Sequence, residues 1–322
     1  DYQAPLYGRA TAKLKLQPLS FGTLAHFLPS FSTEDRVIVY VIMGGIPAYM
    51  ELFVDALDIN TNLREAIVTP LNVMLNDAVF LLREQLDEPR NYMALLEAIA
   101  NGGRKLNSIA QLAGLERSNA NKYLSVLREL GYVKRIVPVT QQRPEKSRRG
   151  RYLFDDAYLR FYFRFLRPYL GDIERGRFNR VLNLLNEHLT DFVGFHTFEA
   201  LCREWLDEAT ERDELPYFLD RVGGHWAKDS EIDVVGVNWR RKTAVFGECK
   251  WGNSSIKLNT VERLGQQPAK ALPQPTKWQV NYLIFSRAKL TQAAQERLAQ
   301  LNGQHITIHQ IEADMQRWEM ES

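Results

Sequence analysis

The spacing of apolar residues changes from a helical to a strand period along this chain. Residues 11–19 alternate like a strand, with leucines on one face and lysines on the other. From about residue 20 to 86, apolar positions recur at helical spacing, and Gly44-Gly45 and Pro70 interrupt them. The first part of the chain is therefore predicted to be a small helical domain with short connections.

Residues 90–155 are predicted to form three short helices followed by a hairpin. Each helix ends at glycine, and two strands enclose a basic loop; the glycines are Gly102-Gly103, Gly114 and Gly131, and the strands cover residues 132–139 and 151–154. Three helices followed by a hairpin are the winged form of the helix-turn-helix. Two further helices are expected over residues 158–169 and 180–192.

The last third of the chain mixes helices and strands. A helix face at Phe198 and Leu201 comes first. Strands are expected over residues 231–238, 244–251, 280–285 and 304–311, with a helix over 260–272 that Pro268 interrupts. This order predicts an α/β domain.

Composition narrows the class of protein. A chain of 322 residues suggests two or three domains, and 45% hydrophobic with 25% charged residues is typical of a globular protein. No window approaches 18 uninterrupted apolar residues, so we expect no membrane span. Cys202 and Cys249 are too few for a disulfide framework and match no zinc motif, so a reducing, cytoplasmic location is expected.

Basic residues gather in the hairpin loop and on the third helix of the winged unit. Those of the hairpin are Lys134, Arg135, Arg143, Lys146, Arg148, Arg149 and Arg151, against one acid, Glu145. The polar residues that face away from the apolar stripe of the third helix are Arg117, Asn119, Asn121, Lys122, Ser125 and Arg128. Asn and Arg suit base edges, whereas Lys and Ser suit phosphates, so we expect DNA binding. The alternative is a protein-docking or hinge module whose charges are only solvated.

The two strands over residues 231–238 and 244–251 carry the candidate chemistry. If they form a hairpin centred on Arg240 and Arg241, Asp233 lies directly opposite Glu248. Alternation then places Glu231, Asp233, Glu248 and Lys250 on one face. Opposed carboxylates destabilise a sheet, and a divalent cation removes that penalty.

This pattern predicts a Mg²⁺ or Mn²⁺ site at Asp233 and Glu248 for phosphodiester cleavage. Lys250 would stabilise charge on the attacked phosphate, and Glu199 from the preceding helix would complete the shell. The alternative is an exposed strand face of mixed charge, with Glu199 simply paired to Arg203. A loop histidine such as His225 is more often idle, and His305 and His309 on one strand face have no metal-site neighbours.

Several stretches together resemble a family of archaeal and bacterial AAA-type ATPases with a nuclease-like C-terminal domain. They read PLYGRATAKLKLQPLSF, GGIPAYMELF, EPRNYMALLEAIANG, SNANKYLSVLRELGYVKRIVPVT, RRGRYLFDDAYLRFYFRF and SEIDVVGVN…AVFGECKWGN. The resemblance implies a P-loop ATPase core, a helical lid, a winged helix and a PD-(D/E)XK nuclease-like domain. This sequence lacks the phosphate-binding loop, so ATP is expected only with a core that these residues do not include. Arg9 would contact nucleotide there, or be a buried structural arginine.

The expected architecture is a multidomain α and α/β protein. Its expected parts are the last strand and lid of an ATPase module over residues 1–88, a winged helix over 89–155, a helical connector over 156–190, and a restriction-endonuclease-like α/β domain over 191–322. The expected function is a DNA-binding, Mg²⁺-dependent nuclease partnered by the ATPase core, with homo-oligomerisation left open. Two alternatives stand beside it: a catalytically silent DNA-binding regulator, and an ATP-driven protein-interaction switch that never touches DNA.

Overall fold

The computed structural model describes residues 16–67, 73–86 and 88–321. Arg9 and most of the strand expected over residues 11–19 lie outside this part of the chain. The described remainder, residues 16–19, forms no strand.

Five helices form the N-terminal part, as the helical spacing predicts. They are α1 (Leu24–Phe27), α2 (Thr33–Met43), α3 (Pro47–Met50), α4 (Ile59–Ile67) and α5 (Val73–Gln85). The Ser32 hydroxyl accepts a hydrogen bond from the Asp35 N–H at 3.1 Å and caps α2. Gly44, with φ at 63°, ends the helix.

The next segment contains the three helices and the hairpin that the sequence predicts. They are α6 (Pro89–Ala100), α7 (Leu106–Leu112), α8 (Arg117–Glu129), β1 (Val133–Ile136) and β2 (Arg151–Phe154), with the short 3₁₀ turn η1 (Pro144–Lys146) in the loop. Gly114 and Gly131 adopt positive φ after α7 and α8, which a side chain would disfavour. β1 and β2 pair antiparallel, so the hairpin forms a wing beside the helices.

A helical connector links the winged unit to the last part of the chain. Its pieces are α9 (Ala157–Phe161), the π-helical η2 (Tyr162–Leu166), η3 (Arg167–Tyr169), α10 (Leu170–Glu174), α11 (Phe178–Val193), the π-helical η4 (Gly194–Phe198) and α12 (Glu199–Glu211). The helices expected over residues 158–169 and 180–192 are therefore present, the first as a broken one. Among the described helices, none is both long and apolar enough to cross a bilayer.

A five-stranded mixed sheet forms the last part of the chain. Its strands are β3 (Arg221–Trp226), β4 (Glu231–Asn238), β5 (Thr243–Lys250), β6 (Gln279–Ser286) and β7 (Gly303–Thr307), in that spatial order. The pairs from β3 to β5 are antiparallel, and those from β5 to β7 are parallel. The helical elements are α13 (Leu258–Gly265), α14 (Gln267–Ala271), η5 (Pro275–Lys277), α15 (Gln292–Gln300) and α16 (Ile308–Glu321).

Two features of this domain differ from the sequence-based prediction. β3 was not predicted, because Gly223 and Gly224 interrupt the apolar pattern of the strand. The strand expected over residues 304–311 ends at Thr307, and α16 follows directly. His309 therefore lies on a helix, and the prediction that it shares a strand face with His305 is wrong.

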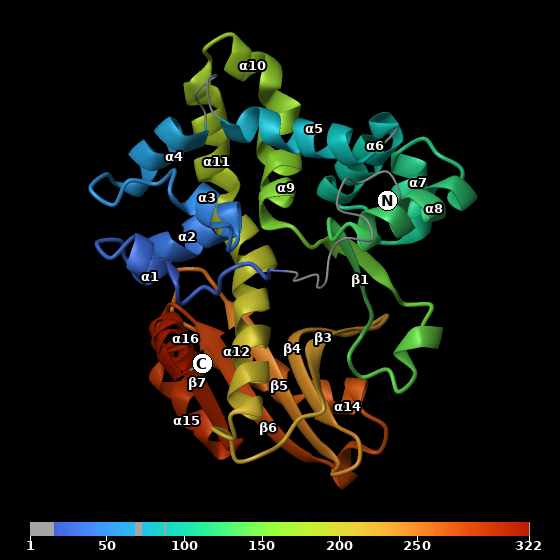
Figure 1. Cartoon of the computed structure of the whole chain (residues 1–322). Helices are drawn as coiled ribbons and strands as arrows, with labels where there is room; N and C mark the ends of the chain where they lie inside the picture. Colours follow the sequence, from blue (N-terminus) through green and yellow to red (C-terminus); the bar gives the residue numbers. More distant parts are fainter. Residues whose placement is uncertain (1–15, 68–72, 87, 322) are drawn as a thin grey trace.

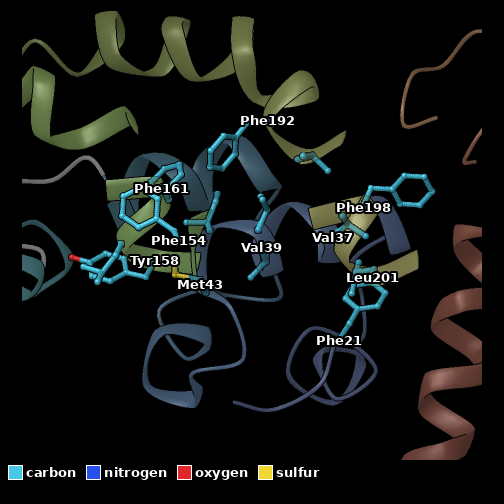
Figure 2. Packing of buried hydrophobic residues seen from close by; sticks show 14 of the residues in the cluster. Phe21, Val37, Val39, Met43, Phe154, Tyr158, Phe161, Phe192, Phe198 and Leu201 are labelled. Carbon is cyan, nitrogen blue, oxygen red and sulfur yellow. The ribbon is translucent and has the colours of Figure 1, made fainter. Parts of the chain in front are cut away.

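Helices cover both faces of the sheet. α12 and α16 pack on one face, and α13 and α15 on the other (Figure 1). The core on the α12 face continues through the connector and the winged unit into the N-terminal helices. Figure 2 shows part of it, where Val39 and Met43 of α2 lie beside Phe161 and Phe192 of the connector. Because this core is continuous, the domain boundaries expected at residues 88, 155 and 190 stay a prediction.

The wing is docked on the edge strand of the sheet. The Val139 N–H donates to the Gly224 carbonyl at 3.0 Å, and Thr140 Oγ1 lies 2.6 Å from His225 Nδ1. The Trp226 indole N–H donates to the Arg149 carbonyl at 2.9 Å. These contacts fix the winged unit relative to the sheet, as the loop below β1 in Figure 1 illustrates.

A buried ion pair joins the N-terminal helices to the C-terminal helix. Arg36 Nε of α2 lies 2.6 Å from Glu312 Oε1 of α16, and their side chains are only 10% and 7% exposed. The Arg36 guanidinium also donates to the carbonyl oxygens of Leu28 and Phe31. Removal of either partner would leave the other charge buried without compensation.

We therefore expect Glu312→Ala to lower the free energy of unfolding by about 3 kcal/mol or more. Denaturant unfolding followed by circular dichroism measures this change. The control is Glu321→Ala, whose carboxylate is 51% exposed, and an exposed pair is worth under about 1 kcal/mol. Equal effects of the two substitutions would show that the Arg36–Glu312 pair does not hold these helices together.

Candidate active site between the winged unit and the sheet

A large cavity lies where the winged unit, the connector and the sheet meet. Its volume is about 1410 Å³, whereas small-molecule pockets are typically about 300–1,000 Å³. Its walls include residues of the α6–α7 turn, the wing, η2, η4, α12 and β3 to β5. The four predicted catalytic residues all line it: Glu199, Asp233, Glu248 and Lys250. A cavity of this size suits a segment of a polymer better than a small metabolite.

The pairing of β4 with β5 has the predicted register. The ladder runs from Asn238↔Thr243 to Val234↔Gly247, so the paired residue numbers add up to 481 throughout. Asp233 and Glu248 follow directly after the last pair, where the two strands part. On the other side of β4, Asp233 and Val234 together oppose the single residue Gly224 of β3, so a bulge lies at these two residues. Such a bulge changes the direction in which a side chain points, so the alternation of side chains along β4 does not by itself determine the orientation of Asp233.

Asp233 and Glu248 have different partners at this point. Asp233 Oδ2 accepts a hydrogen bond from the Cys249 N–H at 2.9 Å. Glu248 Oε1 lies 2.6 Å from Lys250 Nζ and also pairs with Arg263 of α13. The Glu248 side chain is 7% exposed, while that of Lys250 is 39% exposed towards the cavity. The hairpin thus presents a nearly buried carboxylate beside a reachable ammonium group.

Glu199 enters the same site from the start of α12. Arg203, one turn later, donates to Glu199 Oε2 at 2.5 Å and to the Asp233 carbonyl at 2.7 Å. The predicted pairing of Glu199 with Arg203 is therefore real. The pair is not a solvated one, because the side chains are only 18% and 27% exposed. Arg203 links α12 to the bulge in β4 and brings Glu199 towards Asp233.

Burial and mutual repulsion disfavour the charged forms of two of these carboxylates. Burial and, to a smaller extent, the nearby Glu248 raise the pKa of Asp233 to about 6. Burial and Asp233 raise the pKa of Glu199 to about 7. Two neighbouring carboxyls with raised pKa values in a cavity are typical of functional sites.

Asp233 and Glu248 are the side chains of this site that could bind a metal ion. Within the described ranges, no three His, Cys, Asp or Glu side chains are arranged to hold a metal ion. Zn²⁺ sites need three or four such ligands, but Mg²⁺ is commonly bound by one or two carboxylates and several waters. Asp233 and Glu248 supply two carboxylates at the edge of a wide cavity. Two carboxylates are too few for Zn²⁺ and are the kind of donor set that Mg²⁺ or Mn²⁺ uses together with waters.

The predicted DNA-contacting side chains of α8 are on the surface. Arg117, Asn119, Asn121, Lys122 and Arg128 are all exposed, while Ala120, Leu124 and Leu127 are buried beneath them. In the wing, the exposed side chains are Arg143, Lys146, Arg148 and Arg149. Arg151 differs, because it pairs with Glu231 at 2.5 Å and its guanidinium lies 4.6 Å from the Trp226 ring centroid.

Some residues of the site were not predicted from the sequence. Arg263 of α13 contacts Glu248 from a helix that follows the hairpin, and no local pattern indicates this. Arg203 was predicted as a partner of Glu199, but its hydrogen bond to the Asp233 carbonyl oxygen was not predicted. His225 is not idle, since it holds Thr140 of the wing, although its Nε2 atom is buried without a hydrogen-bond partner.

Comparisons with known proteins agree with the helix-turn-helix and leave the chemistry open. Residues 91–136 match the model of the IclR helix-turn-helix domain. Residues 162–263 match DUF234, a family of archaeal and bacterial proteins of unknown function. An uncharacterized protein of Methanocaldococcus jannaschii is 34% identical over 255 residues, which are 78% of this chain and 56% of that protein. The chain thus spans about half the length of this relative. No solved structure matches the chain significantly.

The raised pKa of Asp233 predicts how pH changes the stability of the metal-free protein. The folded state holds the Asp233 proton more tightly than the unfolded state, so stability falls as pH rises from about 4 to about 6. Asp233→Asn mimics the protonated form. In EDTA we expect it to raise the free energy of unfolding by about 1–3 kcal/mol at pH 7.5, with little change near pH 4.

Urea unfolding at both pH values measures this difference. The matched control is Asp213→Asn, at an exposed position with φ of 56° that Asn also tolerates. If Asp233→Asn is less stable than the parent at pH 7.5, the charged Asp233 carboxylate does not destabilise the folded state, and the prediction is wrong.

Proposed function

We propose that this chain binds DNA and cuts a phosphodiester bond with the help of Mg²⁺ or Mn²⁺. The observation that carries the proposal is the shared cavity: Asp233, Glu248 and Lys250 line the same cavity as residues of the winged unit. DNA binding has independent support from the helix-turn-helix match. On this proposal the α/β part is a restriction-endonuclease-like domain of the PD-(D/E)XK type.

The chain's own residues divide the work of the proposed reaction. Asp233 and Glu248 would hold the cation, which supplies polarisation of the phosphate and a more acidic bound water. Lys250 Nζ, which lies beside Glu248, would stabilise negative charge that develops on the attacked phosphate. The Cys249 N–H fixes the rotamer of Asp233, and Arg203 holds Glu199 near it. Because the pKa of Glu199 is about 7, its carboxyl group would give or take a proton near neutral pH.

DNA contact is proposed to involve α8 and the exposed part of the wing. Arg117, Asn119 and Asn121 lie in the first turns of α8, where the recognition helix of a helix-turn-helix meets base edges. The wing guanidinium and ammonium groups lie where they would meet phosphates. Because the wing is docked on β3, DNA held by the winged unit would be held at a fixed position relative to the cavity.

A second candidate function is DNA binding without cleavage. It is favoured by the two cations on Glu248: with Lys250 and Arg263 both paired to it, this carboxylate is already neutralised. A divalent metal would have to displace at least one of them. The ATPase core, ATP and homo-oligomerisation stay predictions from the family resemblance, and so does the protein-interaction switch.

Cleavage and DNA binding should separate in two variants of the site. We expect Asp233→Asn to abolish nicking of plasmid DNA in Mg²⁺ or Mn²⁺ while duplex affinity stays near that of the parent. Lys250→Ala should slow nicking by about 10²-fold or more, because it removes a stabilising charge from the transition state. The measurement is single-turnover nicking on supercoiled plasmid.

The matched controls for these variants are Asp213→Asn and Lys289→Ala, both exposed and outside the cavity. They should nick as the parent does. Parent protein that binds DNA but never nicks it in either metal would favour binding without cleavage. Nicking by Asp233→Asn at the parent rate would contradict the catalytic assignment.

The exposed wing should contribute to duplex affinity through phosphates. We expect the double variant Arg148→Ala, Arg149→Ala to flatten the dependence of log K on log salt by about 0.9 per lost contact. Fluorescence anisotropy with a labelled duplex at several salt concentrations measures the slope. Arg240→Ala, in the exposed turn between β4 and β5, is the control. An unchanged slope in the double variant would mean that this part of the wing does not touch the DNA backbone.

A further inference from the structure

Three arginines gather on the connector side of the cavity. Arg104 follows α6, Arg160 belongs to α9 and Arg164 to η2, and all three line the cavity that holds the carboxylates. They surround His196 of η4 closely enough that each disfavours a charge on its ring. Arg160 and Arg164 are one helical turn apart, whereas Arg104 and His196 are distant from them in the sequence, and the fold brings all four to one wall.

In the part of the chain that the structure describes, acids lie near this cluster but form no direct ion pair with it: Asp156 acts on Arg160 from a distance, and Glu199 and Glu231 act on Arg104. Among the ion pairs of the described residues, none involves Arg104, Arg160 or Arg164. Arg160 donates one hydrogen bond, to Thr197 Oγ1 at 3.3 Å, while its Nε atom is buried without a partner. A buried guanidinium without a directly paired carboxylate is costly, so this wall can accept a further anion.

Aromatic rings lie among these cations. The Arg104 guanidinium lies 4.3 Å from the centroid of the Phe195 ring, and the Phe195 side chain is still 41% exposed. The His196 ring contacts both Phe195 and Phe192. Burial and the three arginines lower the pKa of His196 to about 3, so its ring is neutral at ordinary pH. The wall therefore combines three positive charges, one neutral imidazole and an exposed aromatic edge.

Cations together with an exposed aromatic ring are the usual elements of a single-stranded nucleic-acid site. The cations bind phosphates, and the ring stacks on a base, which only an unpaired base can offer. A small anion such as free phosphate would leave the exposed part of the Phe195 ring in solvent. Burial and the nearby Arg151 lower the pKa of Arg104, whereas Glu231 and Glu199 act in the opposite direction. The cluster therefore lies close enough to the proposed catalytic carboxylates to interact with them electrostatically.

We infer that Arg104, Arg160 and Arg164 with Phe195 form a subsite for a single-stranded DNA segment, whose phosphates the arginines bind and one of whose bases stacks on Phe195. The inference rests on the proposed function for the identity of the strand, and it deepens that proposal. A strand held there lies in the cavity of Asp233 and Glu248, so the substrate class is DNA with an unpaired segment or a frayed end, and not an intact duplex alone.

The test uses the full chain in EDTA, so that cleavage plays no part. The probes are a short fluorescein-labelled single-stranded oligonucleotide of mixed sequence and the duplex of the same sequence, both followed by anisotropy across salt concentrations. For the single strand, the double variant Arg104→Ala, Arg164→Ala should flatten the slope of log K against log salt by about 0.7 per lost phosphate contact. Phe195→Ala should weaken single-strand binding by about tenfold or more.

Arg164 and Phe195 are exposed, so replacing either of them does not uncover the hydrophobic core. The single variants Arg164→Ala and Phe195→Ala therefore test the phosphate contact and the stacking contact separately. Arg240→Ala should bind both probes as the parent does. The result expected is a loss confined largely to the single strand. Unchanged single-strand binding in the double variant and in Phe195→Ala would overturn the subsite, and so would an equal loss for single strand and duplex.

The outcome is separable from that of the proposed nuclease. If the parent never nicks DNA but the arginine and phenylalanine variants lose single-strand binding, the subsite stands and cleavage fails. If the parent nicks DNA while these variants bind the single strand as it does, cleavage stands and the subsite fails.

Discussion

The crowding of acidic groups where β4 and β5 part is the constraint on which this account depends. Asp233 and Glu248 lie next to the last pair of the hairpin, close enough for Glu248 to raise the pKa of Asp233, and α12 adds Glu199. The surrounding structure compensates for this charge with a backbone N–H, an ammonium group and two guanidinium groups. A fold selected only for stability would not bury acids next to one another, since each raised pKa measures a cost to the folded state.

The remainder of the chain holds the cavity around this point in a fixed shape. The wing is bonded to β3, and the N-terminal helices are joined to α16 through Arg36 and Glu312. A hydrophobic core runs without a break from those helices to one face of the sheet. The helix-turn-helix unit and the carboxylates are thus parts of one body, so the fold fixes the position of one relative to the other.

Local patterns predicted much of the fold and the centre of the site. The helices of the winged unit follow from apolar spacing and from glycines with positive φ. The β4–β5 register follows from a short turn, in which Asn238 Oδ1 accepts the Arg241 N–H and Lys242 adopts φ of 55°. Once the turn is known, the position of Asp233 beside Glu248 is a matter of counting.

Contacts between distant segments could not be predicted in this way. β3 lacks an apolar alternation, since its middle is Gly223-Gly224, and it pairs only because β4 lies beside it. The bulge at Asp233 arises from that same pairing. The docking of the wing on β3 and the pairing of Arg263 with Glu248 join residues that no periodicity connects. The arginines around His196 likewise come from three separate elements.

The central claim is that Asp233 and Glu248 form a divalent-cation site. Isothermal titration of the metal-free chain with Mn²⁺ tests it most directly, because it needs neither DNA nor catalysis. We expect one bound Mn²⁺ per chain, lost in Asp233→Asn and in Glu248→Gln but retained in Lys250→Ala. A parent chain that binds no Mn²⁺, or an Asp233→Asn chain that binds it equally well, would contradict the account.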